Sequence, residues 1–133
     1  MRYLLDTDVT IFALKKSDHL ELKYLQVGVD NIAISVITQA ELTFGAYNSQ
    51  RIYENLKRIE QFCQTITILP VSPEVVNAFG QLKVKVYKKG EPLEDFDVMI
   101  AATALSYNLT LATGNVEHFK KIPDLQIENW IRK

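Results

Sequence analysis

Residues 95–105, Asp-Phe-Asp-Val-Met-Ile-Ala-Ala-Thr-Ala-Leu, place two carboxylates directly before a segment that is apolar on nearly every side. Acidic residues favour the first turn of a helix, because the macrodipole there is positive. A helix that is apolar all round is normally buried, and Ala101, Ala102 and Ala104 allow another backbone to approach closely. We therefore expect a buried helix over residues 96–107 with carboxylates at its N-terminal end.

Short apolar runs alternate with helical patterns along the rest of the chain. The pattern predicts strands at residues 3–5, 32–34, 65–69, 109–112 and 125–128, the last at a sheet edge, and helices at residues 9–16, 18–30, up to 47, 50–64 and 73–88. Such alternation is typical of a parallel sheet with helices on both faces. We predict a three-layer α/β/α fold with a central, mostly parallel sheet of four to five strands, in a single domain over residues 1–133.

Several helix starts carry recognisable capping residues. Ser72 followed by Pro73 and an acid predicts the start of the helix over residues 73–88. Asp8 is predicted to cap the first helix, and Ser35 or Thr38 the helix that carries Glu41. Residues 91–92, Glu-Pro, are predicted to form a loop before the helix described first.

Composition and charge limit the classes of protein that need to be considered. The chain has 133 residues, 47% of them hydrophobic and 23% charged, which suits one globular domain with a real core. It has no apolar run long enough to span a bilayer, and Asp6 follows Met1 too closely for a signal peptide. The single Cys63 cannot form an internal disulfide, so we expect a reducing, cytoplasmic setting. The net charge of −1 does not indicate a generally basic nucleic-acid-binding surface.

Three acidic residues far apart in sequence are expected to meet at one edge of the sheet. Asp6 follows the first predicted strand, and Glu41 and Asp97 lie near the starts of predicted helices. Ligands of parallel sheets bind at the carboxyl ends of the strands. Clustered carboxylates repel one another, and Mg²⁺ or Mn²⁺, which prefer oxygen ligands, would relieve that repulsion and could activate water for a phosphodiester displacement. The two histidines, His19 and His118, lack the spacing of a catalytic triad.

Four motifs stand in order along the chain: residues 4–8 (Leu-Leu-Asp-Thr-Asp), 38–42 (Thr-Gln-Ala-Glu-Leu) with Gly45, 97–105 (Asp-Val-Met-Ile-Ala-Ala-Thr-Ala-Leu), and 111–115 (Leu-Ala-Thr-Gly-Asn) with Phe119. They resemble the motifs of PIN-domain ribonucleases, and specifically of VapC-type toxins of bacterial toxin–antitoxin pairs. Residues 122–125 and 128–130 also resemble the end of that family. The resemblance covers essentially the whole chain.

The resemblance implies a PIN-like fold and a metal-dependent endoribonuclease that acts as the toxin of a type II toxin–antitoxin system. It implies Mg²⁺ or Mn²⁺ as cofactor, a homodimer, and inhibition by a cognate antitoxin, VapB-like or another small DNA-binding protein. Single-stranded or looped RNA is the expected substrate class, because splayed strands can reach such a groove. Carried over by motif, Asp6, Glu41 and Asp97 are the acidic site. We expect Asp6 and Asp97 to bind the metal directly, and Glu41 to bind it through water or to orient the attacking water. Thr113 or Asn115 would position the phosphate or the metal's water ligands.

One family position departs from the usual pattern. The fourth site position, often Asp in the family, is Asn115 here. An amide brings no charge, so a second metal would be held more weakly. Asp95 could compensate as an outer acid, and we expect it to support the site rather than to rank with the three main acids.

Each of these residues also has an ordinary structural interpretation. Asp6 could be a strand-end turn residue, and Glu41 stands three residues after Thr38, which is the capping-box spacing. Either Asp95 or Asp97 could be a simple N-cap. The remaining candidates fit turns or solvated surface: Thr113, Asn115 and His118 as turn residues, and Lys83, Lys85, Lys88 and Lys89 as an exposed face, with RNA contact as the second interpretation.

Two other functions are compatible with parts of the sequence. Residues 6–10, Asp-Thr-Asp-Val-Thr, fit the DxDxT pattern of haloacid-dehalogenase-like phosphatases, in which Asp6 would be the nucleophile. That family places its last acidic pair after a strand, whereas Asp95 and Asp97 open a helix, and it has no role for Glu41. A catalytically weak, PIN-like protein-binding module is the other alternative, and Asn115 favours it.

Overall fold

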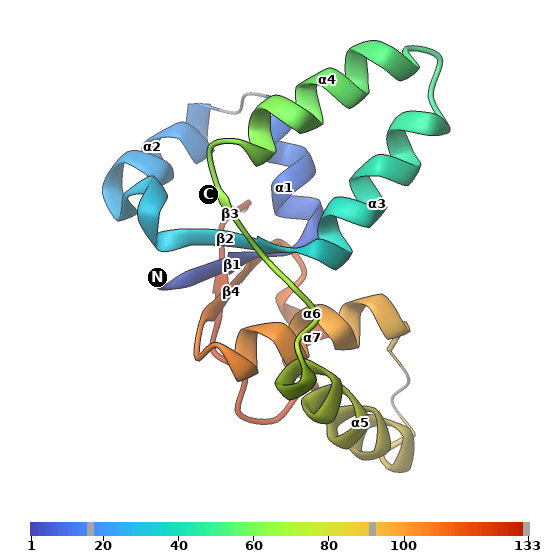
Figure 1. The fold of residues 1–133 in the computed structure, drawn as a ribbon. Coiled ribbons are helices and arrows are strands. Elements are labelled where there is room, and N and C mark those ends of the chain that lie inside the picture. The colour runs from blue at the N-terminus through green and yellow to red at the C-terminus, as the bar shows by residue number, and fades with distance from the viewer. Residues whose placement is uncertain (16–17, 91–92, 132–133) are drawn as a thin grey trace.

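A computed structural model describes residues 1–15, 18–90 and 93–131, which form a five-stranded sheet with helices on both faces (Figure 1). In chain order the elements are β1 (Tyr3–Leu5), α1 (Thr7–Leu14), α2 (Asp18–Val27), the 3₁₀ turn η1 (Val29–Asn31), β2 (Ile32–Ser35), α3 (Val36–Tyr47), α4 (Ile52–Cys63), β3 (Thr67–Leu69), α5 (Pro73–Lys88), α6 (Asp95–Ser106), β4 (Thr110–Thr113), α7 (Val116–Phe119) and β5 (Ile127–Asn129). The predicted α/β/α layers are confirmed.

All strand pairs of the sheet are parallel, in the order β3-β2-β1-β4-β5. The predicted last strand is confirmed as an edge strand. The chain first moves outward from β1 through β2 to β3, and then crosses to the other side of β1 to form β4. Leu4 of β1 pairs with Ala33 on one side and Leu111 on the other. The order therefore reverses between β1 and β4, which is where ligands bind in open parallel sheets.

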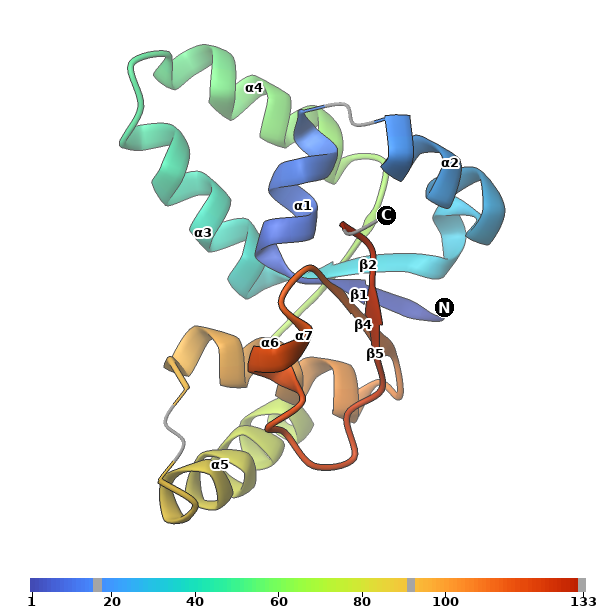
Figure 2. The same cartoon turned by 180° about the vertical axis from the view of Figure 1, so that it is seen from behind.

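Alternate residues of the strands supply two cores, one on each face of the sheet. Leu4 and Leu111 pack into the cluster that includes residues of α5 and α6. Tyr3 and Leu5 face the opposite way, into the cluster with Val9 of α1 and the fully buried Trp130. Figure 2 shows the same division from behind, with α5 and α6 on one face and α1, α2 and α4 on the other. This period of two follows from the pleat of a strand.

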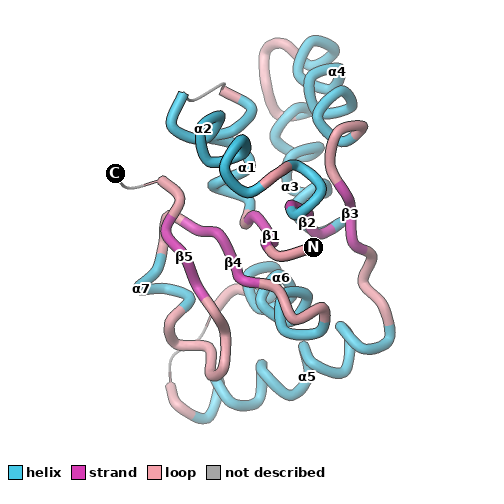
Figure 3. The backbone as a smooth tube through the Cα atoms, turned by 90° about the vertical axis from the view of Figure 1, so that its left-hand side faces the viewer, coloured by secondary structure: helices cyan, strands magenta, loops and turns pink. Residues whose placement is uncertain are grey.

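The helix α6 is buried on nearly every side, as its sequence predicts. Val98, Ile100, Ala101, Ala102 and Ala104 are all fully buried. The helix lies between the sheet and α5 (Figure 3), against which it packs closely. The alanines make this position possible because a small side chain permits a short distance between backbones. The first turn of α6, with its acids, is thereby held at the edge of the sheet.

The structure corrects two of the predicted helix caps and confirms two others. Asp6, not Asp8, caps α1, since its Oδ1 accepts a hydrogen bond from the Val9 N–H at 2.8 Å. Glu94 occupies the N-cap position of α6, so the cap predicted for Asp95 or Asp97 is wrong. Side-chain oxygens cap α3 and α5 as predicted, from Ser35 and Ser72 respectively.

Parts of two predictions fall outside the described residues. They are the predicted end of the first helix at residue 16 and the loop at residues 91–92. Among the helices that the structure describes, none is both long and apolar enough to cross a membrane.

Candidate active site

A polar cavity of about 200 Å³ opens where the carboxyl ends of β1 and β4 meet the first turn of α6. The residues that line it are Asp6, Thr7, Asp8, Glu41, Glu94, Asp97, Asn115, His118 and Phe119. The fold thus brings the three predicted acids into one cavity, from the end of β1, from α3 and from α6. We predicted that these acids meet, and the order of the sheet explains it, because that order decides which strand ends lie together.

Asp6 is the most deeply placed of these acids, with only 3% of its surface exposed. Its Oδ2 accepts a hydrogen bond from the Thr113 hydroxyl at 2.5 Å, and its Oδ1 accepts the capping bond from Val9. Burial raises the pKa of Asp6 to about 6; the two hydrogen bonds oppose this rise, and the nearby Asp8 and Asp97 carboxylates add to it. Holding Asp6 ionised therefore costs the folded protein about 3 kcal/mol.

Glu41 points toward α1 rather than toward the start of its own helix. Its Oε1 accepts a hydrogen bond of 2.6 Å from the Thr7 hydroxyl, which also lies 3.2 Å from the Thr38 hydroxyl. The capping-box interpretation is wrong, because Ser35 caps α3 and Glu41 bonds elsewhere. Thr7 was not among the predicted site residues, although its place directly after Asp6 was a signal.

Asp97 meets a residue for which we predicted no role in the site. The Nε2 atom of His118 lies 2.9 Å from Asp97 Oδ2. The interpretation of His118 as a turn residue is wrong, because it lies in the short helix α7. Its spacing was the missed signal: a residue three places after Asn115 on a helix projects from the same side as Asn115.

The supporting residues occupy different places around the cavity. Asn115 lines it and is exposed. Thr113 is fully buried behind Asp6, so it positions that carboxylate rather than a substrate. Asp95 is absent from the lining and instead forms an exposed ion pair with Lys83 of α5, at 3.0 Å. The structure therefore separates the two acids that open α6.

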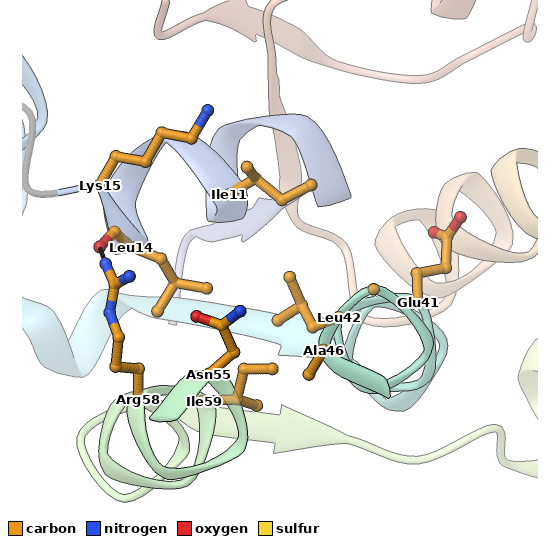
Figure 4. A pocket seen from close by; sticks show the side chains of 10 residues that line it. Ile11, Leu14, Lys15, Glu41, Leu42, Ala46, Asn55, Arg58 and Ile59 are labelled. Carbon is orange, nitrogen blue, oxygen red and sulfur yellow. Dashed lines mark hydrogen bonds between the residues drawn. The ribbon is translucent and has the colours of Figure 1, made fainter. Parts of the chain in front are cut away.

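Figure 4 shows a second hollow, of about 250 Å³, which shares Glu41 with the acidic cavity. It lies between α1, α3 and α4, and its lining is mainly apolar, with Ile11, Leu14, Leu42, Ala46 and Ile59 alongside Lys15, Glu41, Gly45, Asn55 and Arg58. The Arg58 guanidinium donates to the carbonyl of Leu14 and so ties α4 to the end of α1. Among the described residues, Glu41 is the one that lines both hollows.

The donor set of the acidic cavity suits a hard divalent cation. Carboxylate oxygens are the ligands that Mg²⁺ and Mn²⁺ prefer, and no ion pair links Asp6 to a basic side chain in the part of the chain that is described. Within residues 1–15, 18–90 and 93–131, no three His, Cys, Asp or Glu side chains stand close enough together to hold one ion as they are placed. Binding would therefore require the partly exposed carboxylates to close around the ion.

The chain is similar to named proteins over almost its whole length. A family model described as the PIN domain matches residues 3–125. The chain is 33% identical to Ribonuclease VapC2 of Rickettsia felis and 32% identical to the tRNA(fMet)-specific endonuclease VapC of Salmonella typhimurium, with 98% of both chains covered in each case. The DNA-bound VapBC structure from Salmonella typhimurium contains a chain that matches with a TM-score of 0.94, at 32% identity and 98% coverage of both. This chain therefore belongs to the PIN-domain family, among its VapC ribonucleases.

Proposed function

We propose that the protein is a metal-dependent endoribonuclease that acts as the toxin of a type II toxin–antitoxin system. One observation carries the proposal. Asp6, Glu41 and Asp97 come from three separate elements and line one cavity, at the place between β1 and β4 where the strand order reverses. Membership of the VapC ribonucleases gives this cavity its expected chemistry. The phosphatase alternative has no such support.

The proposed roles follow from how each side chain is held. Asp6 and Asp97 would hold Mg²⁺ or Mn²⁺. When bound, the ion would supply the positive charge that makes water acidic and neutralises the developing charge on a phosphodiester. Glu41, fixed by Thr7, would accept a proton from the attacking water or orient it. Asn115, exposed at the cavity rim, would donate to the substrate phosphate. Asp95 would act only as an outer charge.

Single-stranded or looped RNA is the proposed substrate class. A cavity at a sheet edge can admit a splayed strand more readily than a paired helix, whose backbone is held in a fixed geometry. One relative, from Salmonella typhimurium, is named a tRNA(fMet)-specific endonuclease. The tRNA(fMet) is accordingly the first RNA to test. The cytoplasm is the proposed location of the protein.

A VapB-like antitoxin, or another small DNA-binding protein, is the proposed partner. The similar Salmonella structure is a VapBC complex bound to DNA. The apolar hollow between α1, α3 and α4 offers a surface for such a partner, and because Glu41 borders both hollows, an occupant there could also block the acidic cavity. Exposed apolar side chains on α3 and α5 support the proposed homodimer: Phe44, Tyr47, Val84 and Tyr87.

The proposal is tested by digesting RNA with the purified protein, freed of any antitoxin. Cleavage should occur with Mg²⁺ or Mn²⁺ and stop in EDTA. The variants Asp6→Asn and Asp97→Asn should both lose cleavage. Wild-type rates from either variant would refute the site, and a phospho-aspartyl intermediate on Asp6 with a phosphate monoester would favour the phosphatase alternative.

The second candidate function is a catalytically weak PIN-like module that binds a protein partner. Asn115 favours it, because an amide stands where a fourth carboxylate could hold another metal. Absence of RNA cleavage at every metal concentration, together with tight binding of a partner, would support this candidate.

A further inference from the structure

His118 is placed to act on Asp97 from the wall of the acidic cavity. Its Nε2 atom lies 2.9 Å from Asp97 Oδ2, and both side chains are about one-third exposed or less, at 26% and 33%. An ionised carboxylate can only accept hydrogen bonds. The imidazole must therefore donate from Nε2, in either its neutral or its protonated form.

Two contacts position His118: its ring packs against Phe119, and its backbone N–H is hydrogen-bonded to Asn115. Its ring meets the buried Phe119 ring edge-on, with 5.1 Å between centroids and an interplanar angle of 87°. The backbone N–H of His118 donates to the Asn115 carbonyl at 3.2 Å. The Asn115 N–H in turn donates to the Thr113 hydroxyl at 2.9 Å, and that hydroxyl donates to Asp6.

These contacts form one connected path from Asp6 to Asp97. It runs from Asp6 through Thr113 and the start of α7 to His118, and from His118 directly to Asp97. The start of α7 therefore connects the hydrogen bond made to Asp6 with the hydrogen bond made to Asp97.

We propose that His118 is a positioning residue for Asp97. By donating to Oδ2 it holds the carboxylate in one orientation and leaves Oδ1 available to a divalent cation. This inference rests on the proposed metal-dependent function. Hydrogen-bond partners of metal ligands are typically worth about 10- to 100-fold in metal affinity.

The test is a titration of the full-length protein with Mn²⁺ alone, with free Mn²⁺ measured by electron paramagnetic resonance. Three variants separate the hydrogen bond from the bulk of the ring. His118→Gln can place an amide N–H near the position of Nε2, His118→Asn can reach only the position of Nδ1, and His118→Leu has no donor. We expect the Leu and Asn variants to bind Mn²⁺ about 10-fold or more weakly, because both lose the donor to Oδ2. The Gln variant should bind within about threefold of wild type, because it retains a donor to the metal ligand.

Melting curves in EDTA provide the structural control. All three variants should unfold within a few degrees of wild type, because the His118 side chain is partly exposed. A weaker Mn²⁺ affinity without a lower melting temperature is a result that a merely structural role would not produce.

Several outcomes would overturn the inference. Mn²⁺ binding by the Leu variant as tight as wild type would show that the hydrogen bond is irrelevant, and tighter binding would show that His118 competes with the ion for Asp97. A Gln variant as weak as the Leu variant, or a wild type that binds no Mn²⁺, would also overturn it.

RNA digestion distinguishes this failure from failure of the proposed function. If wild type cleaves RNA with Mn²⁺ while the Leu variant binds Mn²⁺ normally, only the role of His118 is wrong. If wild type binds Mn²⁺ and the variants behave as expected but no RNA is cleaved, the role of His118 stands and the ribonuclease proposal fails.

Discussion

The hydroxyl of Thr113 donates a hydrogen bond of 2.5 Å to Oδ2 of Asp6, although 107 positions separate the two residues in sequence. Asp6 follows β1 and Thr113 ends β4, and these strands are neighbours in the sheet. Both side chains are buried. The acid therefore depends on a residue of another strand for one of the two hydrogen bonds that keep it ionised at neutral pH.

Replacement of Thr113 by Val should destabilise the protein at pH 7. The change keeps the shape of the side chain but removes a donor to a buried carboxylate, and hydrogen bonds to charged groups are worth about 1.5–3 kcal/mol. We expect that loss in the free energy of unfolding, measured by urea denaturation in EDTA. Thr113→Ser retains the hydroxyl and serves as the matched control, since it should lose less than the Val variant. Equal stability of the Val variant and wild type would contradict the role given to this bond.

Titration of Asp6 should make the protein more stable as the pH falls from 7 to 5. Burial raises its pKa in the folded state from 3.8 to about 6, so the folded protein binds the proton more tightly than the unfolded chain. The penalty for ionised Asp6 is complete well above the folded-state pKa and disappears as the pH falls toward 3.8. This carboxyl should add about 1 kcal/mol to the free energy of unfolding between pH 7 and pH 5.

Because other groups titrate in the same range, the pH effect is read as a difference between wild type and Asp6→Asn. Denaturation of both proteins at pH 5, 6 and 7 in EDTA should show the gain in wild type only. A parallel pH dependence of the two proteins would mean that Asp6 titrates normally.

Divalent metal should raise the melting temperature of wild type, because a ligand that binds only the folded state stabilises it. In EDTA, Asp97→Asn should melt higher than wild type, since one of the charges that repels Asp6 is removed while an acceptor for His118 remains. We expect a rise of no more than about 4 °C, corresponding to about 1 kcal/mol. Thermal scans with Mg²⁺ and with EDTA measure both effects. A lower melting temperature of the variant in EDTA would assign Asp97 a mainly structural role.

The two acids of the first turn of α6 should differ sharply in importance. Asp97 lines the cavity, whereas Asp95 pairs with Lys83 at the surface. Asp97→Asn should lower the RNA cleavage rate by about 100-fold or more, because charge stabilisation by a metal is worth several kcal/mol. Asp95→Asn, the same chemical change two residues away, should stay near the wild-type rate and stability, since exposed ion pairs contribute about 0–1 kcal/mol. Similar losses of cleavage in both variants would place Asp95 in the site.

Gly114 should tolerate no larger residue without movement of the carboxyl-terminal segment. A Cβ at this position would lie 2.5 Å from Ile131 Cδ1 and 3.1 Å from its Cβ. Gly114→Ala should destabilise the protein by about 1–3 kcal/mol, as overpacking does. Adding Ile131→Ala removes the closest atom, so the double variant should lose less than the two single changes together. Strict additivity in a denaturation cycle would contradict the clash.

Much of the fold could be predicted from local sequence. The alternation of apolar runs and helical patterns indicated a parallel sheet with helices on both faces, and Ser72 followed by Pro73 marked the start of α5 correctly. The apolar, alanine-rich segment after Asp97 indicated the buried helix α6. These features are readable because hydrophobic period and capping chemistry act within a few residues of the chain.

The caps of α1 and α6 show where local reasoning failed. Asp8 and Asp95 are good capping residues by type, but the caps lie at Asp6 and Glu94. The helix α1 begins almost directly after β1 ends. The first residue of α1 therefore follows from where the strand leaves the sheet, and not from which nearby residue is the best capping residue. A helix boundary defined by backbone hydrogen bonds can differ by one or two residues from the one that residue type indicates.

The sequence alone indicated the three main acids of the candidate site, since Asp6, Glu41 and Asp97 could be picked out by residue type and position, but it did not indicate Thr7 or His118. Only the tertiary structure decided the partner of each: Thr113 for Asp6, Thr7 for Glu41, His118 for Asp97 and Lys83 for Asp95. The physical reason is the order of the sheet. Placing β4 beside β1 brings the start of α7 to the same edge as Asp6 and Asp97, and that order depends on burial summed over the whole chain rather than on any local segment.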